Sequence, residues 1–177
     1  AHSSTGRFPE IGTAGNLPSG EAYIVPYEGE RKTPSATAGV LPVEIGGEVV
    51  YYKIEKNTAV SAEGGPTAQE ESDYLKREPA YGNMAELGFG ILGKFGLSPC
   101  GEILLDEKLG LHIAFGRSDH FGGRIGLKDF STPAAVIHLD RIYLPEMQPR
   151  VAVVEVVLSF ARGRTEMIMK DGRYTIF

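Results

Sequence analysis

Cysteine is nearly absent from the sequence, with Cys100 as the single example among 177 residues. One cysteine excludes an intrachain disulfide and any zinc site built mainly from thiolates. Long apolar runs are missing as well, and none approaches the roughly 18 residues that would span a bilayer. Together these absences favour a protein of a reducing compartment, and we expect it to be cytoplasmic.

Positive charge is also in short supply. The chain has 18 lysines and arginines against 23 acidic residues, which gives a formal net charge of −5 and a pI near 5.4. Such a balance argues against partners that are reached through bulk positive charge. We therefore expect no nucleic-acid partner and no membrane partner.

An initiator methionine is missing too, and the opening "AHSSTGRFPE" resembles the middle of a longer polypeptide. A length of 177 residues with 42% hydrophobic content suits one domain with a sizeable core. We expect residues 1–177 to form a single domain taken from a longer chain.

Helical patterning is sparse, whereas 23 glycines and 11 prolines punctuate short apolar segments. One helix is predicted over 66–78, because Pro66 suits the first turn and Pro79 ends the pattern. A second short helix is predicted over 101–108, and its "DEK" at 106–108 is expected to form a charged helix end.

Strands dominate the rest of the sequence. The run "VAVVEVVLSF" is rich in β-branched residues and is expected in the centre of a sheet, and Asp171-Gly172 predicts a tight hairpin turn. The sequence thus predicts an α+β fold, with a β-rich mixed sheet or partly open barrel and one or two short helices. The strand candidates are Glu21–Tyr27, Gly47–Ile54, Thr58–Ala62, Met84–Gly88, Leu111–Phe115, Ala134–Leu139, Arg150–Phe160, Glu166–Met169 and Arg173–Ile176.

A histidine and an aspartate stand two residues apart in "AAVIHLDRI", residues 134–142. Side chains at i and i+2 of a strand point the same way, so His138 and Asp140 share one face while Ile137 and Leu139 fill the other. A half-buried strand with polar residues toward water would show this alternation. Two metal ligands on one face are the other interpretation.

The same alternation recurs on other strand candidates. His112 shares a face with Ala114, Glu86 lies beside Gly88, and Glu21 begins a strand directly after turn residues. Burying unpaired carboxylates costs on the order of several kcal/mol each, which a pair of divalent metal ions would offset. A single histidine on a strand is more often a hydrogen-bonded structural residue, so both interpretations stay open at this point.

Five short blocks occur in a fixed order over about residues 15–145: "NLPSGEAYIVPYEG", "NMAELGFGI", "ILLDEKLGLHIAFG", "FGGR" and "VIHLD". In order and approximate spacing they resemble the aminopeptidase T / aminopeptidase S family of metallopeptidases. The resemblance implies that this chain corresponds to the C-terminal, metal-binding half of a two-domain protein. It also implies a broad-specificity aminopeptidase that acts on small peptide or aminoacyl substrates and forms a homodimer.

The resemblance further implies which residues hold metal. Glu21 and Glu86 match the family's two glutamate ligands, and Glu86 would bridge two ions. His112, His138 and Asp140 match the remaining three ligands. The implied cofactors are two divalent metal ions, either zinc, cobalt or manganese, and the implied reaction is attack of metal-activated water on a peptide carbonyl.

One position departs from the family pattern. The family has a catalytic tyrosine seven residues after its first histidine ligand, whereas "HIAFGRSDH" has Asp119 there and His120 next to it. A tyrosine hydroxyl can hydrogen-bond a developing oxyanion that an ionised aspartate would repel. We consider Asp119 and His120 as the candidate catalytic residues, with His120 as donor or general acid. A loop position without a catalytic role fits His120 equally well.

Two other functions fit parts of the same pattern. His112, His138 and Asp140 form the two-histidine, one-carboxylate set of non-haem Fe(II) oxygenases, and the ring-cleaving dihydroxypyridine dioxygenases resemble the aminopeptidase family. A catalytically degenerate metal-binding domain that serves in assembly is the third hypothesis. Glu21 and Glu86 favour the dinuclear hydrolase, because a mononuclear iron site needs neither.

Overall fold

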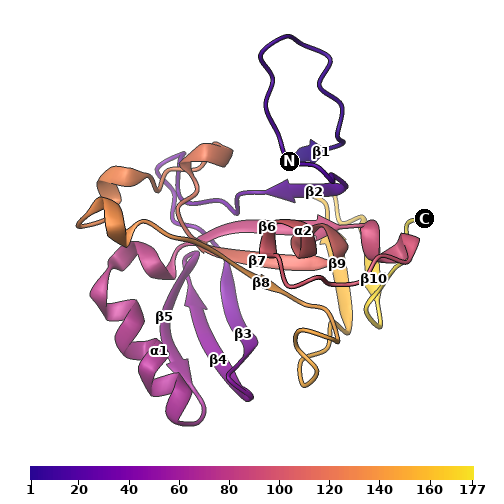
Figure 1. Ribbon diagram of the computed structural model, residues 1–177. Coiled ribbons are helices and arrows are strands. Elements are labelled where there is room, and N and C mark those ends of the chain that lie inside the picture. The colour runs from indigo at the N-terminus through magenta and orange to yellow at the C-terminus, as the bar shows by residue number, and fades with distance from the viewer.

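The computed structural model describes residues 1–177 and contains three antiparallel sheets and two helices (Figure 1). The predicted α+β, β-rich class is confirmed, and none of the sheets closes into a barrel. The largest sheet has the strand order β1-β2-β6-β7-β8. Its strands are β1 (His2–Ser4), β2 (Glu21–Ile24), β6 (Met84–Gly90), β7 (Leu111–Gly116) and β8 (His138–Ile142).

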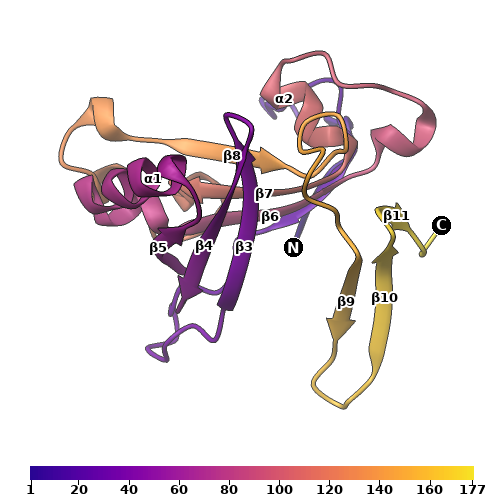
Figure 2. The same ribbon diagram turned by 90° about the horizontal axis from the view of Figure 1, so that it is seen from below.

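A second sheet joins β3 (Ala38–Ile45), β4 (Glu48–Glu55) and β5 (Thr58–Glu63) in sequence order. Helix α1 (Pro66–Arg77) follows directly and lies along β5 (Figure 2). Pro66 occupies its first turn, and Lys76 and Arg77 lie in its last turn, where they complement the negative end of the helix dipole.

The sequence did not indicate β3, because Pro42 interrupts its apolar pattern. Pro42 is tolerated because β3 is an edge strand that pairs only with β4.

The third sheet contains β9 (Glu155–Ser159), β10 (Thr165–Lys170) and β11 (Arg173–Tyr174), in the order β11-β10-β9. Asp171 and Gly172 both have positive φ in the turn between β10 and β11, as a tight hairpin requires. The prediction that the run at 151–160 lies centrally is wrong. β9 is an edge strand in an arm that projects from the body (Figure 2), and Val157 and Leu158 are exposed.

Short helical segments make up the remaining regular structure. Helix α2 (Ile103–Asp106) covers part of the predicted 101–108 helix and continues as a 3-10 turn. No helix has the length and apolar character that a membrane span requires. The 3-10 turns are η1 (Pro79–Gly82), η2 (Leu92–Phe95), η3 (Glu107–Leu109), η4 (Asp119–Phe121), η5 (Leu127–Asp129) and η6 (Pro133–Ala135).

The predicted strand over 134–139 is shorter at its start and longer at its end. Residues 133–135 form η6, because Pro133 suits a first helical turn and the Thr132 hydroxyl accepts a hydrogen bond from the Ala135 amide. β8 begins only at His138 and continues to Ile142. His138 and Asp140 therefore still lie on one strand with one residue between them.

The two faces of the five-stranded sheet differ in chemistry. On β7, Ile113 and Phe115 face the β3–β5 sheet and join the main core with Val43, Val50 and Tyr52. His112 and Ala114 alternate with them and belong to the opposite face. The core therefore lies between two sheets, and the candidate residues lie on the far side of the larger one.

Candidate metal centre

Cross-strand register brings two carboxylates into one row. Glu86 on β6 pairs with Ala114 on β7, and Ala114 pairs with Asp140 on β8. All three side chains therefore leave the sheet on the same face. Because Ala114 carries only a methyl group, the space between Glu86 and Asp140 is open to other groups.

Gly88 makes room for the imidazole of His112 in the next row. The two residues pair across β6 and β7, and a methyl group at Gly88 would overlap the His112 ring. The ring therefore extends across β6 toward β2. Its Nε2 lies 3.6 Å from Oε2 of Glu21 and 3.4 Å from Oε1 of Glu86.

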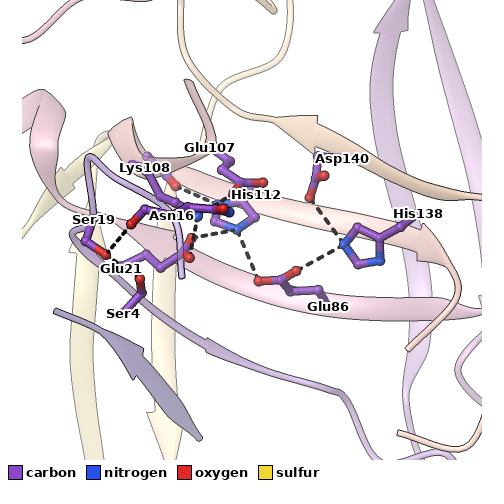
Figure 3. Close-up of polar contacts among 11 residues, drawn as sticks. Ser4, Asn16, Ser19, Glu21, Glu86, Glu107, Lys108, His112, His138 and Asp140 are labelled. Carbon is purple, nitrogen blue, oxygen red and sulfur yellow. Dashed lines mark hydrogen bonds and ion pairs between the residues drawn. The ribbon is translucent and has the colours of Figure 1, made fainter. Parts of the chain in front are cut away.

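Glu86 lies between two imidazoles, as Figure 3 shows. Its Oε2 is 3.2 Å from Nε2 of His138, while its Oε1 faces His112. The same Nε2 of His138 is 3.9 Å from Oδ1 of Asp140. The fold thus brings together all five residues that the sequence singled out as metal ligands.

The cluster contains three groups of side chains that could each hold a metal ion, with one candidate ligand atom per residue and these atoms within 4.8 Å of one another. The groups are Glu21–Glu86–His112, Glu86–His138–Asp140 and Glu107–His112–Asp140. Glu86 belongs to the first two groups, which is the arrangement that a bridging carboxylate requires.

Both histidines point Nε2 into the cluster. Nδ1 of His112 is 3.1 Å from the carbonyl oxygen of Gly110, and Nδ1 of His138 is 2.7 Å from that of Arg117. A carbonyl can only accept, so Nδ1 donates its hydrogen, and in the neutral ring Nε2 carries the lone pair that can bind a metal ion. Metal-binding histidines are held in the same way in known sites.

Several polar atoms of the cluster are buried without a hydrogen-bond partner: Oε2 of Glu21, Nε2 of His112 and Oδ1 of Asp140. His112 is completely buried, and Glu86 is 3% exposed. Buried polar atoms are nearly always paired in folded proteins. All three residues belong to the metal-holding groups, although no single group contains all of them, so each unpaired atom is a potential metal ligand.

Burial and charge together set the pKa values in the cluster. Burial disfavours ionised Glu86, but its contacts with His112 and His138 outweigh this and lower the pKa of Glu86 to about 2. Burial also opposes the charge of both histidines, yet the contact with Glu86 leaves their pKa values raised. Burial raises the pKa of Asp140. Without a metal ion, the cluster therefore retains protons that an ion would displace.

Two further charged residues, which the sequence placed at a helix end, enter the cluster. Glu107 and Lys108 lie in η3, and both are buried. Nζ of Lys108 lies 2.5 Å from Oε1 of Glu21 and also donates to Oε1 of Glu107. Residues 106–108 do lie at the end of a short helix, as predicted, but their side chains are buried. Asp106 is buried as well, where it accepts hydrogen bonds from the amides of Cys100 and Gly101.

The two candidate catalytic residues are placed differently. The carboxylate of Asp119 is 2.5 Å from Nε of Arg117 and belongs to none of the three metal-holding groups. The ring of His120 lies edge-on to His138, with 4.9 Å between centroids. His138 is the most exposed of the five clustered side chains, at 20%. His120 therefore lies at the open side of the cluster, while Asp119 pairs away from it.

A hollow of about 840 Å³ lies elsewhere on the molecule. Leu111, Tyr143, Met169 and Tyr174 are among its lining residues. Leu111 alternates with His112 on β7, so this hollow opens on the face opposite the cluster. The most exposed side chain of the cluster is instead that of His138, beside His120.

Comparisons with known proteins establish the fold of the chain but not its activity. No protein-family model matches the chain, and no curated protein matches its sequence. Among solved structures, the chain is similar to wild-type AmpT from Thermus thermophilus, with a TM-score of 0.58 and 20% sequence identity. The match covers 91% of this chain but only 41% of that one. The chain therefore has the fold of a part of aminopeptidase T.

Proposed function

We propose that this chain is a metal-dependent hydrolase of the aminopeptidase type. The observation that carries the proposal is the position of Glu86 between two imidazoles whose Nε2 atoms face inward. The unpaired atoms of Glu21, His112 and Asp140 support a cation at this place. The likeness in fold to AmpT supports the reaction class. The activity and substrates of that longer protein stay proposals for this chain.

When bound, a divalent ion lowers the pKa of a coordinated water and polarises a substrate carbonyl. Glu86, His138 and Asp140 would hold the ion beside the open side of the cluster. The Nδ1 hydrogen bonds to the Gly110 and Arg117 carbonyls fix both imidazoles, so they need no reorientation during the reaction.

We assign to His120 the role that the catalytic tyrosine has in the aminopeptidase family, because this chain has no tyrosine at that position. It lies at the open side next to His138, and burial and the nearby His138 lower its pKa. A lowered pKa keeps its imidazole largely neutral near pH 7, so one ring nitrogen can donate a hydrogen bond to the substrate. Asp119 pairs with Arg117 instead, and we assign it no contact with the substrate.

The number and identity of the ions remain predictions. Two ions, as the sequence resemblance implies, would occupy the two groups that share Glu86. A single ion with three protein ligands and a water is sufficient in many catalytic sites. Zinc, cobalt and manganese all suit a set of imidazole and carboxylate ligands.

The geometry is unfavourable for a mononuclear iron oxygenase. That hypothesis needs His112, His138 and Asp140 around one ion, but His112 and His138 fall in different groups. Each histidine shares its group with Glu21, Glu86 or Glu107, and carboxylate-rich surroundings of this kind suit hydrolytic sites better.

Hydrolysis can be tested on protein stripped with chelator and reloaded with zinc, cobalt or manganese. We expect release of chromophore from aminoacyl p-nitroanilides only after reloading, and loss of this activity in Asp140→Asn. Asp73→Asn, which changes an exposed carboxylate on α1, is the matched control and should behave like the wild type. Metal binding without turnover of any substrate in the panel would instead support the degenerate domain.

A further inference from the structure

A lysine ammonium lies inside the acidic cluster. Nζ of Lys108 contacts Oε1 of Glu21 at 2.5 Å and Oε1 of Glu107, and the whole residue is 2% exposed. Removing a lysine ammonium from water costs several kcal/mol or more, so it is kept inside a protein only where carboxylates compensate. Here two carboxylates from separate elements, β2 and η3, do so (Figure 3).

The backbone holds this ammonium in place. Lys108 lies in the middle of η3, and this turn rests directly on β6 at Gly90, where a methyl group would overlap the backbone of Glu107 and Lys108. The Gly90 amide also donates to the carbonyl of Gly110, 2.9 Å away, just after the turn. The lysine therefore enters the cluster from a fixed turn, and its position is part of the fold.

The ammonium uses the same carboxylates that a second metal ion would need. Glu21 and Glu107 each belong to one of the three metal-holding groups. An ion in either group would share a carboxylate with the ammonium and would be repelled by it at short range. The third group, Glu86–His138–Asp140, makes no hydrogen bond or ion pair with Lys108.

We propose that Lys108 takes the place of a second metal ion, so that the native centre binds one divalent ion, held by Glu86, His138 and Asp140. This inference rests on the proposed function only in that the cluster holds metal. Lys108 then has a structural charge role: it neutralises Glu21 and Glu107, whose burial would otherwise leave two further carboxylates without a cation.

The test is metal stoichiometry, measured by elemental analysis after loading with zinc and extensive dialysis. We expect one zinc per wild-type chain and two per Lys108→Met chain, because the substitution frees Glu21 and Glu107 to bind an ion together with His112 and keeps a side chain of similar length. Lys108→Arg, which keeps the positive charge, should remain at one. Lys128→Met removes an exposed lysine and is the matched control.

Two further variants decide the matter if Lys108→Met does not fold. Glu21→Gln should retain the single zinc, and Asp140→Asn should lose it. Loss of the ion in Glu21→Gln would overturn the proposal, and so would a folded Lys108→Met chain that still binds only one. Two ions per wild-type chain would overturn the proposal while leaving the hydrolase intact, whereas no bound ion would overturn both.

Discussion

Oε2 of Glu86 on β6 lies 3.2 Å from Nε2 of His138 on β8, although β7 lies between these two strands. The contact crosses an intervening strand because Ala114 and Gly116 of β7 present almost no side chain between them. A carboxylate and an imidazole reach each other over that strand, with Asp140 beside them. The small residues of β7 therefore let side chains from β6 and β8 meet on this face, and most of our predictions test the residues that meet there.

Removing a single ligand from β8 should abolish metal binding and leave the fold intact. In His138→Ala and Asp140→Ala we expect the metal affinity to fall by about 100-fold or more. The metal-free Asp140→Ala chain should be at least as stable as the wild type, since burial raises the pKa of Asp140 and so opposes its charge. Isothermal titration with zinc and thermal melts measure the two effects. Full metal stoichiometry in either variant would show that the ligand assignment is wrong.

Glu86→Gln should weaken binding without removing side-chain volume. The amide keeps the shape of the carboxylate but loses its charge, and only one of its two terminal atoms is still an oxygen that can bind a metal ion. We expect a loss in zinc affinity on the order of that for Asp140→Ala, since Glu86 belongs to two of the three groups. Glu44→Gln, on the opposite side of the core in β3, is the matched control. Equal affinities in Glu86→Gln and the control would exclude Glu86 as a ligand.

Some of this centre could be predicted from single strands. Alternation alone places His138 with Asp140 on one face, and sets His112 apart from Ile113 and Phe115. Alternation does not give the register between strands, so the meeting of Glu86 with His138 could not be derived from it. The order of the sequence blocks, through their family resemblance, supplied that step.

Two other features could not be predicted from the sequence, for physical reasons: the burial of Lys108 and the edge position of the strand within residues 151–160. Lys108 follows a short helix, and a charge at that position has the same local pattern whether it turns to water or inward. Its burial depends on the close approach of η3 to β6 at Gly90.

The run at 151–160 has the β-branched composition of a central strand. That composition indicates an extended backbone, but it does not indicate how many neighbouring strands will pair with it.

His120→Ala should reduce turnover more than metal uptake. His120 touches His138 only edge-on and belongs to none of the metal-holding groups, so zinc stoichiometry should not change. If His120 donates to the substrate, kcat should fall by about 100-fold, the scale of a single general acid–base contribution, with little change in KM. Asp119→Asn, which alters the neighbouring residue, should have a much smaller effect. Unchanged kcat in His120→Ala would leave it as a loop residue.

Gly88→Ala should destabilise the protein through a clash with one ring. The added methyl group would overlap the buried imidazole of His112, which cannot easily turn because Nδ1 is bonded to Gly110. We expect a loss of about 1–3 kcal/mol in the free energy of unfolding, as for other overpacked cores. The control is the double variant Gly88→Ala/His112→Ala. If the cost of Gly88→Ala is as large in that background as in the wild type, the clash is not with His112.

The metal-free protein should lose stability as the pH rises above the ordinary histidine pKa of about 6.5, and bound metal should reverse the trend. The pKa values of His112 and His138 are raised on folding, so their contribution is fully present below the ordinary histidine pKa of 6.5 and is lost as the pH rises through the higher folded values. The raised pKa of Asp140 acts in the same direction, because the folded state resists its ionisation. His120, with a lowered pKa, acts oppositely but only below the ordinary histidine pKa, so His120→Ala should leave the decline above that pH unchanged. Metal binding requires deprotonated ligands, so the gain in Tm on adding zinc should grow with pH. Melting curves of chelator-treated and zinc-loaded protein across this range give both slopes, and a Tm of the metal-free protein that rises with pH would contradict the proton balance of the cluster.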